Sequence, residues 1–389
     1  MTLTLEVWDG SNWIDKTSSC VSLRRHIRSN GLEELDGELV KDVVAVGQEI
    51  RLKEDGSIVF EGIVYEVDRE HRGRDVERCG FKTYDKLILW DRHVVYRAYP
   101  TGTKAGEIIR DLASLEDIPI NLSGVEDGDS LLSPWEIQNE KALDVMKSVA
   151  RGTNYWLRMK PCLSYLSFDG ENDYVEVAHS SSLNITDAIT IEAFVKVNSF
   201  VNDYPVIVGK NNAYVSRFDA LDTATGRMMA SFYIDGTWVH IYGNTEIDAG
   251  KWIHHVVTFK SDVGTKLYLN TNLDKEDSTT GTIGTTTNPV LIGNYEGLVR
   301  YLDGLIAYVR IYNRALSASE IRHNYLNPMN PVTDGLVLWL NFHNIQDNVV
   351  PDLSGNDNDG TIYGASQGYE VYPKYVNSFL MEFKPKVIA

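Results

Sequence analysis

The sequence has few cysteines and lacks the common motifs of metal and nucleophile chemistry. Cys20, Cys79 and Cys162 are an odd number, lie far apart and have no CxxC spacing. This pattern predicts reduced, mostly buried thiols in a protein that folds in a reducing compartment, and it suggests no zinc site. GxSxG, HExxH and Walker motifs are also missing, so no local signature points to an enzyme.

Positive charge and long apolar runs are scarce as well. The chain has 37 Lys and Arg against 55 Asp and Glu, a net charge of -18. Binding to a phosphate backbone needs clustered cations, so nucleic acid is not an expected partner. No apolar run approaches the roughly 20 residues that span a membrane. The N-terminus, MTLTLEVWDGSNW, lacks the basic segment and apolar core of a signal peptide.

The rest of the composition is that of a globular β protein. The 389 residues are 43% hydrophobic and 24% charged, which predicts two to three domains that each bury a core. Aromatic residues make up 10% of the chain and include 21 Tyr. They favour β structure and surfaces that recognise a ligand.

The first 100 residues or so read as short strands. Glu49–Lys53 and Ser57–Val67 alternate on either side of Asp55-Gly56, which predicts a hairpin in a small barrel or sandwich. The charge-dense stretch Arg69–Arg78 carries both signs and predicts a solvated loop.

Two helices and a strand follow. Thr103 is a candidate cap for a helix over Lys104–Leu115, and Asn139 for a second over Glu140–Arg151, because each precedes apolar residues at helical spacing. A strand is predicted at Tyr155–Met159.

The clearest local pattern lies in residues 302–321. Leu305–Ile311 alternates with one aliphatic face, which predicts a half-buried strand. Ser317 then stands three residues before Glu320, a reciprocal capping arrangement that predicts a helix from Ala318 to about Tyr325.

This segment resembles the last strand and terminal helix of a laminin-G-like (concanavalin-type) jelly roll, and other pieces of that pattern lie upstream in the expected order. Phe194 stands where the family usually has Trp, which leaves its packing role intact. The resemblance implies a β-sandwich jelly roll over residues 161–367. The other matching pieces are Phe168–Gly170 with Asp173–Val175, Ile189–Val195, Lys251–Val256, Lys266–Leu269 and Leu291–Gly293.

The pieces after the capped helix are out of the family's usual order. Asp334–Leu340 and Asp352–Ala365 resemble a run that normally precedes the Phe168–Gly170 strand. A circularly permuted order would close the same two sheets, and a truncated second copy is the alternative. Residues 368–389 hold the strand-like Ser378–Phe383, which we expect to return to the first domain, so that the jelly roll is inserted near that domain's end.

Residues 1–160 resemble, in the order of their elements, the N-terminal domain of bacteriophage tail hub proteins, the baseplate hub and late-control-protein-like family. The order is a strand-rich barrel with a hairpin, a helix, and a helix followed by a strand. The resemblance implies a homotrimer around the tail axis, other tail proteins as partners and a place at the tail tip of a virion. Release by lysis would explain an exterior-type module without a signal peptide.

Two sets of site residues follow. Oxygen ligands at alternate positions in a glycine-containing loop suit Ca²⁺, which laminin-G-like jelly rolls often carry, although such residues also form ordinary Asx turns. The expected structural calcium ligands are Asp352, Ser354, Asn356 and Asn358, completed by Asp169 and Asp173.

The jelly-roll resemblance also implies glycan recognition. Exposed aromatics stack on sugar faces, while polar groups bind the hydroxyls. Candidates at or near predicted strand ends, where loops would form a binding rim, are Tyr214, Arg217, Trp238 and Tyr295. Each could instead be a packing or solvent residue. Trp252 is expected in the core, and His254 and His255 on opposite strand faces.

The predicted fold is mainly β with some α: an N-terminal hub-like β-barrel or α+β domain (residues 1–160), the laminin-G-like jelly roll (161–367) and a returning C-terminal strand (368–389). The predicted function is a non-enzymatic tail-tip component that displays the jelly roll to a host-surface glycan or protein. One alternative is a free lectin or adhesion module. Another is the accessory module of a glycoside hydrolase, which requires a carboxylate pair in residues 1–160.

Overall fold

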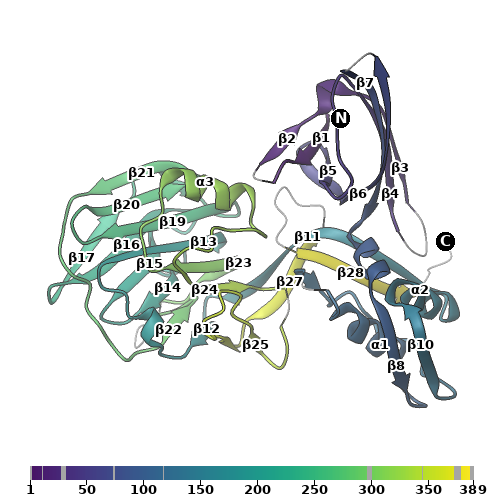
Figure 1. The fold of residues 1–389 in the computed structure, drawn as a ribbon. Coiled ribbons are helices and arrows are strands. Elements are labelled where there is room, and N and C mark those ends of the chain that lie inside the picture. Colours follow the sequence, from purple (N-terminus) through teal and green to yellow (C-terminus); the bar gives the residue numbers. More distant parts are fainter. Residues whose placement is uncertain are drawn as a thin grey trace. The chain divides into compact units, whose positions relative to one another are not determined.

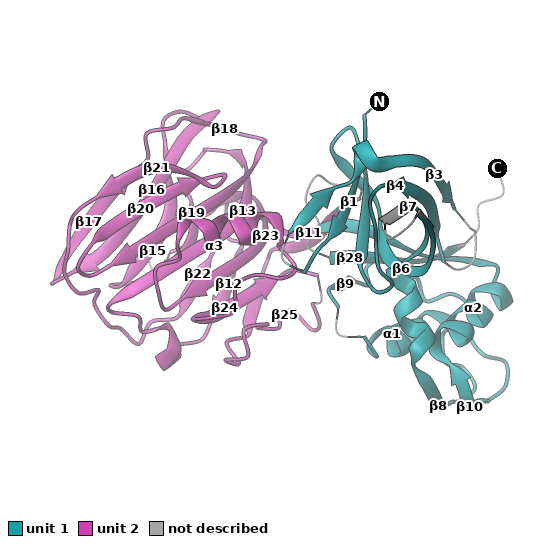
Figure 2. Ribbon diagram, turned by 45° about the horizontal axis from the view of Figure 1, so that its top comes forward, with its two compact units in different colours: residues 1–163, 370–389 teal, residues 164–369 magenta. Residues whose placement is uncertain are grey.

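The computed structural model describes residues 2–10, 12–27, 32–72, 75–116, 118–295, 300–343, 345–371 and 378–385. The chain divides into two compact units (Figure 2). Unit 1 comprises residues 1–163 and 370–389, and unit 2 comprises residues 164–369. The protein is mainly β, as predicted. In the described residues, no helix is both long enough and apolar enough to cross a membrane.

Unit 1 begins with a curled, seven-stranded antiparallel sheet in the order β2-β1-β5-β6-β7-β4-β3. Alternate side chains fill the inside of the curl, among them Leu5, Ile50 and Phe60. The strands are β1 (Leu3–Trp8), β2 (Trp13–Asp15), β3 (Cys20–His26), β4 (Glu34–Val40), β5 (Glu49–Glu54), β6 (Ser57–Arg72) and β7 (Asp75–Asp85), with a short 3-10 turn, η1 (Thr17–Ser19).

The β5–β6 hairpin confirms one local prediction and corrects another. Asp55 and Gly56 both have positive φ, 47° and 84°, as a tight hairpin turn requires. The predicted loop at residues 69–78 is wrong where the structure describes it, because residues 69–72 belong to β6 and residues 75–78 to β7. Residues 73 and 74 lie outside the described residues. Opposite charges face each other across the ladder there, for example Glu70 opposite Arg78, so mixed charge stabilises paired strands instead of breaking them.

The second part of unit 1 holds two helices, and both predicted caps are wrong. Helix α1 starts after Lys104, whose backbone N–H donates to Glu107 at 2.8 Å, while the Thr103 hydroxyl donates to the Pro100 carbonyl. Asn139 has φ 58° in a bulge of β10. The elements are η2 (Lys86–Arg92), β8 (Val94–Tyr99), α1 (Ala105–Ala113), β9 (Ile120–Asn121), β10 (Trp135–Lys141) and α2 (Ala142–Gly152).

The C-terminal strand lies in unit 1. Strand β28 (Ser378–Pro385) pairs antiparallel with the first half of β11 (Tyr155–Asp169), and β9 pairs parallel with β28. At the end of the β11 ladder the Cys162 thiol lies 3.3 Å from the Ser378 hydroxyl. The chain therefore returns to unit 1 after completing unit 2.

Unit 2 is a sandwich of two antiparallel sheets (Figure 1). Sheet one has the order β21-β20-β19-β13-β23, and the second half of β11 also pairs with β23. Its strands are β13 (Ala188–Ser199), β19 (Trp252–Lys260), β20 (Gly264–Leu269), β21 (Asn272–Asp277), β23 (Asp303–Tyr312) and β24 (Leu336–Asn341), with β27 (Ser366–Val371) on β11.

Sheet two has the order β17-β16-β15-β14-β22-β12-β26-β25. Its inner face packs on sheet one, where Phe232 and Phe259 meet with ring centroids 5.0 Å apart. The strands are β12 (Tyr174–Val177), β14 (Val206–Lys210), β15 (Tyr214–Ala220), β16 (Thr225–Ile234), β17 (Thr237–Tyr242), β18 (Ile247–Asp248, on β16), β22 (Val290–Ile292), β25 (Val349–Val350) and β26 (Gly360–Tyr363), with a short turn η3 (Ser181–Leu183).

The strands after the capped helix join these same two sheets. Strand β24 pairs with β23 in sheet one, and β26 pairs with β12 in sheet two. The prediction that the run after the helix closes the jelly roll is therefore confirmed. Ser317 and Glu320 form the predicted capping box, with the Ser317 N–H donating to Glu320 at 2.8 Å, at the start of α3 (Ala318–Leu326).

The outer face of sheet one is more deeply buried than predicted. Strand β23 was expected to be half-buried, but its Arg310 is fully buried beneath α3. Arg310 donates a hydrogen bond to the Glu192 carboxylate. Asn324 of α3 donates to the same carboxylate. His254 and His255 are also both buried. His254 contacts Glu192, whereas His255 lies near Ser216 of sheet two, so they do point to opposite faces as predicted.

Phe194 and Trp252 stack on this outer face. Phe194 is buried and packs against the Trp252 ring at 5.1 Å, which confirms its packing role. Trp252 is only half-buried, and the Lys196 ammonium lies 5.4 Å from its ring. The expectation that Trp252 is a core residue is therefore wrong. Trp252 is the first residue of β19, and its side chain stays partly exposed.

Candidate functional site

The outer face of sheet two carries a pocket because three neighbouring strands alternate between core and solvent. On β15, for example, Tyr214 and Phe218 are directed into the sandwich core, which places Val215 and Arg217 on the other face. The same alternation on β16 and β17 places five further lining side chains next to one another on the outer face. These are Met229 and Ser231 of β16, and Trp238, His240 and Tyr242 of β17.

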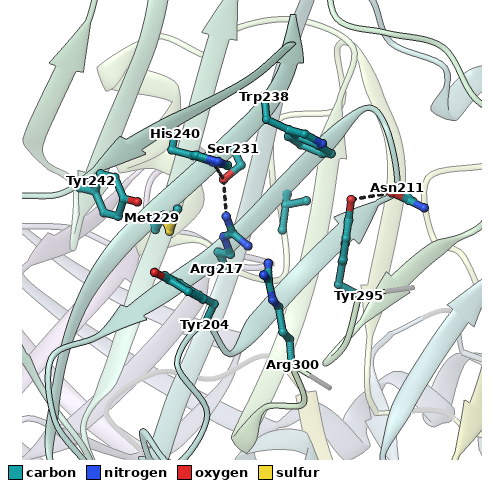
Figure 3. Close-up of a pocket in the computed structure, with 11 residues that line it drawn as sticks. Tyr204, Asn211, Arg217, Met229, Ser231, Trp238, His240, Tyr242, Tyr295 and Arg300 are labelled. Carbon is teal, nitrogen blue, oxygen red and sulfur yellow. Dashed lines mark hydrogen bonds between the residues drawn. The ribbon is translucent and has the colours of Figure 1, made fainter. Parts of the chain in front are cut away.

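Segments from outside the three strands complete the pocket, whose volume is about 610 Å³. Tyr204 precedes β14, Asn211 lies in the turn between β14 and β15, and Tyr295 and Arg300 come from the segments after β22. Figure 3 shows the guanidinium groups of Arg217 and Arg300 near the centre, with Trp238 and Tyr295 on one side of them and Tyr204 on the other.

Arg217 is the most deeply buried charge in the pocket, with 5% of its surface exposed. It donates to the Ser231 hydroxyl at 2.9 Å, and that hydroxyl lies 2.8 Å from Nδ1 of His240. Its buried Nε has no hydrogen-bond partner among the described residues. Burial and, next, the positive charge of Arg300 lower the pKa of Arg217 to about 10, so the group stays charged at neutral pH.

The two arginines share one aromatic ring. The guanidinium carbons of Arg217 and Arg300 lie 5.1 Å and 5.2 Å from the centroid of Tyr204, within reach of a cation–π interaction. No described residue that lines the pocket is an Asp or Glu. Burial and the charges of both arginines lower the pKa of His240, which favours its neutral form. The pocket is therefore positive in a chain of net charge -18.

An aromatic wall faces the arginines. Trp238 makes edge contact with Tyr295, with centroids 6.3 Å apart, and also packs against Tyr233. The Tyr295 hydroxyl donates to Oδ1 of Asn211 at 2.6 Å, which fixes the ring. Together the wall and the arginines can stack a planar or apolar ligand face and donate hydrogen bonds to its oxygens.

The structure brings Arg217, Trp238 and Tyr295 together but not Tyr214. The Tyr214 ring is fully buried, and its hydroxyl donates to the Leu183 carbonyl at 3.1 Å. That candidate is wrong because its strand parity points it into the core. The pocket also lies mainly on a sheet face, and segments outside the strands supply only part of its lining. The remaining lining residues were missed, although the alternation of Trp238, His240 and Tyr242 on one predicted strand was a usable signal.

The expected calcium ligands of residues 352–358 form a loop that satisfies its own polar groups. The Asp352 carboxylate accepts hydrogen bonds from the backbone N–H groups of Trp339, Ser354 and Asn358 and from the Ser354 hydroxyl. The Asn356 side chain donates to the Leu336 carbonyl, and that of Asn358 donates to the Val337 carbonyl. This is the hydrogen bonding of Asx turns, the alternative interpretation of the same residues.

Asp169 and Asp173 do not complete that loop's shell. The Asp173 carboxylate accepts the Asp169 N–H at 2.9 Å beside the Tyr174–Tyr363 end of the β12–β26 ladder, whereas Asn358 adjoins the Val177–Gly360 end. Those two ends are about 10 Å apart at about 3.3 Å per residue. Among the described residues, no group of three or more His, Cys, Asp or Glu is arranged to hold a metal.

Comparison with solved structures finds low-identity likenesses. A candidate carbohydrate binding protein from Bacteroides ovatus is 11% identical over 95% of this chain and 93% of its own, with a TM-score of 0.48. Domain 4 of the Geobacillus stearothermophilus arabinanase AbnA is 16% identical over 41% and 74%, with a TM-score of 0.32. The 43 kDa tail protein of prophage MuSo2 from Shewanella oneidensis is 12% identical over 40% and 52%, with a TM-score of 0.32. These values are too low to assign a function.

A search of curated proteins finds no match. Comparison with protein families, in contrast, gives a result for unit 2. Residues 169–322 match the family described as the concanavalin A-like lectin/glucanases superfamily. The matched range begins at the end of β11 and runs into α3, so it contains all of the strands that form the pocket. Unit 2 of this chain therefore contains a laminin-G-like, concanavalin A-like lectin/glucanase domain.

Proposed function

We propose that the protein is a non-enzymatic binding protein whose jelly-roll pocket takes a glycan of a host surface. One observation carries the proposal: the indole of Trp238 and the donor groups of Arg217 converge in a single pocket of about 610 Å³ on an open sheet face. Ligand pockets commonly have volumes of about 300–1,000 Å³.

The chemistry of the lining supports binding without catalysis. An aromatic ring can cover the apolar face of a sugar, while guanidinium and amide groups bind its hydroxyls. Glycosidases act through two carboxylates, and the described lining has none. A smaller pocket of about 200 Å³ in unit 1 likewise has no carboxylate among its described lining residues. This weakens the alternative of a glycoside-hydrolase module.

The test is a glycan array with the full chain and two variants. Trp238→Ala removes the stacking ring and should reduce binding to any captured glycan by about tenfold or more, because truncating a Trp that anchors a ligand commonly costs about 2 kcal/mol or more. Tyr363→Ala removes an exposed aromatic of β26 outside the pocket and should leave binding unchanged. If a host-surface protein is the ligand instead, the array stays blank.

We further propose that unit 1 docks into the tail tip of a virion, with other tail proteins and two further copies of this chain as partners. The order of the β5–β6 hairpin, α1, α2 and β11 supports the resemblance to tail hub domains. Light scattering should then give three times the chain mass of 43.8 kDa. A strict monomer would favour the alternative of a free lectin or adhesion module.

A structural calcium in the loop of residues 352–358 stays a proposal. Titrating Ca²⁺ into chelator-treated protein should raise the melting temperature if the metal binds the folded state, and Asp352→Asn should abolish that rise. A melting temperature that is indifferent to calcium would leave the Asx turns as the explanation of the loop.

A further inference from the structure

The pocket concentrates positive charge that no carboxylate among its described lining residues neutralises. Neither Arg217 nor Arg300 has a carboxylate partner within salt-bridge distance among the described residues, whereas Arg227 on the neighbouring strand is paired with Asp219. Two like charges beside one tyrosine ring repel each other. A site that needed only hydroxyl contacts would gain nothing from this arrangement.

Of the two arginines, Arg217 has the larger free-energy cost of burying its positive charge. A guanidinium that is 5% exposed has lost most of its hydration, and burying a charge is unfavourable unless it is paired and hydrogen-bonded. Among the described residues, the Ser231 hydroxyl alone accepts from its terminal nitrogens, and its buried Nε has no partner there. A ligand that completes these contacts has to supply an acceptor, and a negatively charged acceptor would also offset the two guanidinium charges.

The neighbours of the arginines hold them ready for such a partner. Ser231 and His240 form a chain that fixes one end of the Arg217 fork, and the Tyr204 ring lies beside both guanidinium groups. A fixed planar fork matches the oxygens of a carboxylate or sulfate and loses little entropy when it binds them.

We propose, on the basis of the glycan-binding function above, that the ligand is an acidic glycan: Arg217 and Arg300 bind the carboxylate or sulfate of a sugar whose ring packs on Trp238. The aromatic wall argues against a bare inorganic anion, because the partly exposed Trp238 offers apolar surface that only an attached ring would cover. A neutral sugar would leave both charges without a counter-ion among the described lining residues.

The test is calorimetric titration of the full chain with matched sugars. The acidic probes are 3′-sialyllactose and trigalacturonate, which bear carboxylates, and κ-carrageenan oligosaccharides, which bear only sulfate; lactose and galactotriose are the neutral counterparts. At least one acidic probe should bind about tenfold or more tightly than its neutral counterpart, and its affinity should fall as salt rises. Comparison of the three acidic probes identifies the acidic group.

Variants locate the anion. Arg300→Gln removes a half-buried charge and should weaken acidic-sugar binding about tenfold or more while neutral sugars are unaffected. Arg217→Lys keeps the charge but loses the fork, and should weaken the same probe. Arg322→Gln, an exposed arginine of α3 outside the pocket, is the control of equal charge. Thermal melts establish that each variant is folded.

The outcomes separate the two proposals. If neutral sugars bind as tightly as acidic ones, and Trp238→Ala abolishes binding while Arg300→Gln does not, the glycan function stands and the acidic ligand is overturned. If no probe of either kind binds and the glycan array is blank, both proposals fall. If Arg322→Gln weakens acidic probes as much as Arg300→Gln does, the attraction is diffuse and the assignment to this pocket is overturned.

Discussion

Arg310 donates to Glu192 across 2.9 Å, and neither side chain is exposed to solvent. The same carboxylate lies 2.8 Å from His254 Nε2 and accepts from Asn324 of α3 at 2.7 Å. Burial alone would raise the pKa of Glu192, but the charge of Arg310 and the contact with His254 lower it. The ion pair thus ties strands β13, β19 and β23 to the helix that covers them.

Removing one partner of this pair should destabilise unit 2 strongly. Arg310→Met leaves Glu192 buried without its counter-ion, and we expect the free energy of unfolding to fall by about 3–5 kcal/mol. Denaturant unfolding of the full chain, followed by hydrogen exchange of β13 and β23 peptides, measures the loss. The double variant Glu192→Gln/Arg310→Met should recover part of it, and Arg322→Met, exposed on α3, should cost little. Equal losses in all three would contradict the pairing argument.

The capping box at the start of α3 gives a smaller, local prediction. Ser317 accepts from the Glu320 N–H at 3.3 Å while Glu320 accepts from the Ser317 N–H. Ser317→Ala should therefore cost about 1 kcal/mol, seen as faster amide exchange in the first turn of α3. Ser319→Ala, in the same turn, removes only a hydroxyl contact and should cost less. A larger effect at Ser319 would mean that the cap does not hold the helix start.

The two units should respond to pH in opposite directions. Burial raises the pKa of Asp85 in unit 1 from 3.8 to about 8. Between pH 3.8 and about 8 the folded state keeps a proton that the unfolded state has lost. The contribution of Asp85 to the free energy of unfolding therefore falls as pH rises. Burial lowers the pKa of His255 in unit 2 from 6.5 to about 3. Here the unfolded state holds the extra proton, so stability is lost as pH falls through that range.

Calorimetric melting of the full chain at pH 5 and pH 7.5 checks this. Asp85→Asn should gain stability relative to the native chain as pH rises, because it removes the buried acid while keeping an acceptor for the Leu87 N–H, which Asp85 now binds at 3.0 Å. His255→Gln should gain relative to the native chain as pH falls. A difference between variant and native chain that is the same at both pH values would refute the assignment for that residue.

Asp352 should be a stability determinant whether or not calcium is present. Its carboxylate accepts four hydrogen bonds, one from Trp339 of β24 and three from within the loop of residues 352–358. Asp352→Ala removes them all and should lower the unfolding free energy by at least about 2 kcal/mol, at about 0.5–1.5 kcal/mol for each hydrogen bond. Asp357→Ala, an exposed neighbour, is the control, although its φ of 56° adds some backbone cost. Equal melting of the native chain and Asp352→Ala in chelator would contradict the prediction.

Local sequence patterns were sufficient to predict several strands and helices, but they were insufficient to predict which residues form the pocket. The hairpin at Asp55, the strand of residues 305–311 and the capped α3 all follow from signals within a few residues. Asn139 failed because a bulge, which depends on the partner strand, takes the residue that a cap would use. Tyr214 failed for a related reason, since shifting a strand's parity by one residue exchanges its two faces.

The pocket shows the same limit more sharply. Arg217 and Trp238 could be proposed from their type and place on predicted strands. Tyr204 and Arg300 lie in loops almost a hundred residues apart in the chain and meet beside one another only after the sheet has formed. No periodicity connects them, so the charge of the pocket was not predictable from the sequence.

The entry and exit of unit 2 are next to each other. Strand β27 pairs with β11, and a side chain at Gly368 would collide with the ring of Tyr165. A short bridge between β11 and β28 could therefore replace residues 164–369 without stretching the chain that remains. The jelly roll is in this sense an insertion that can be replaced as one piece: recombination at a single site could give unit 1 a different second domain in one step.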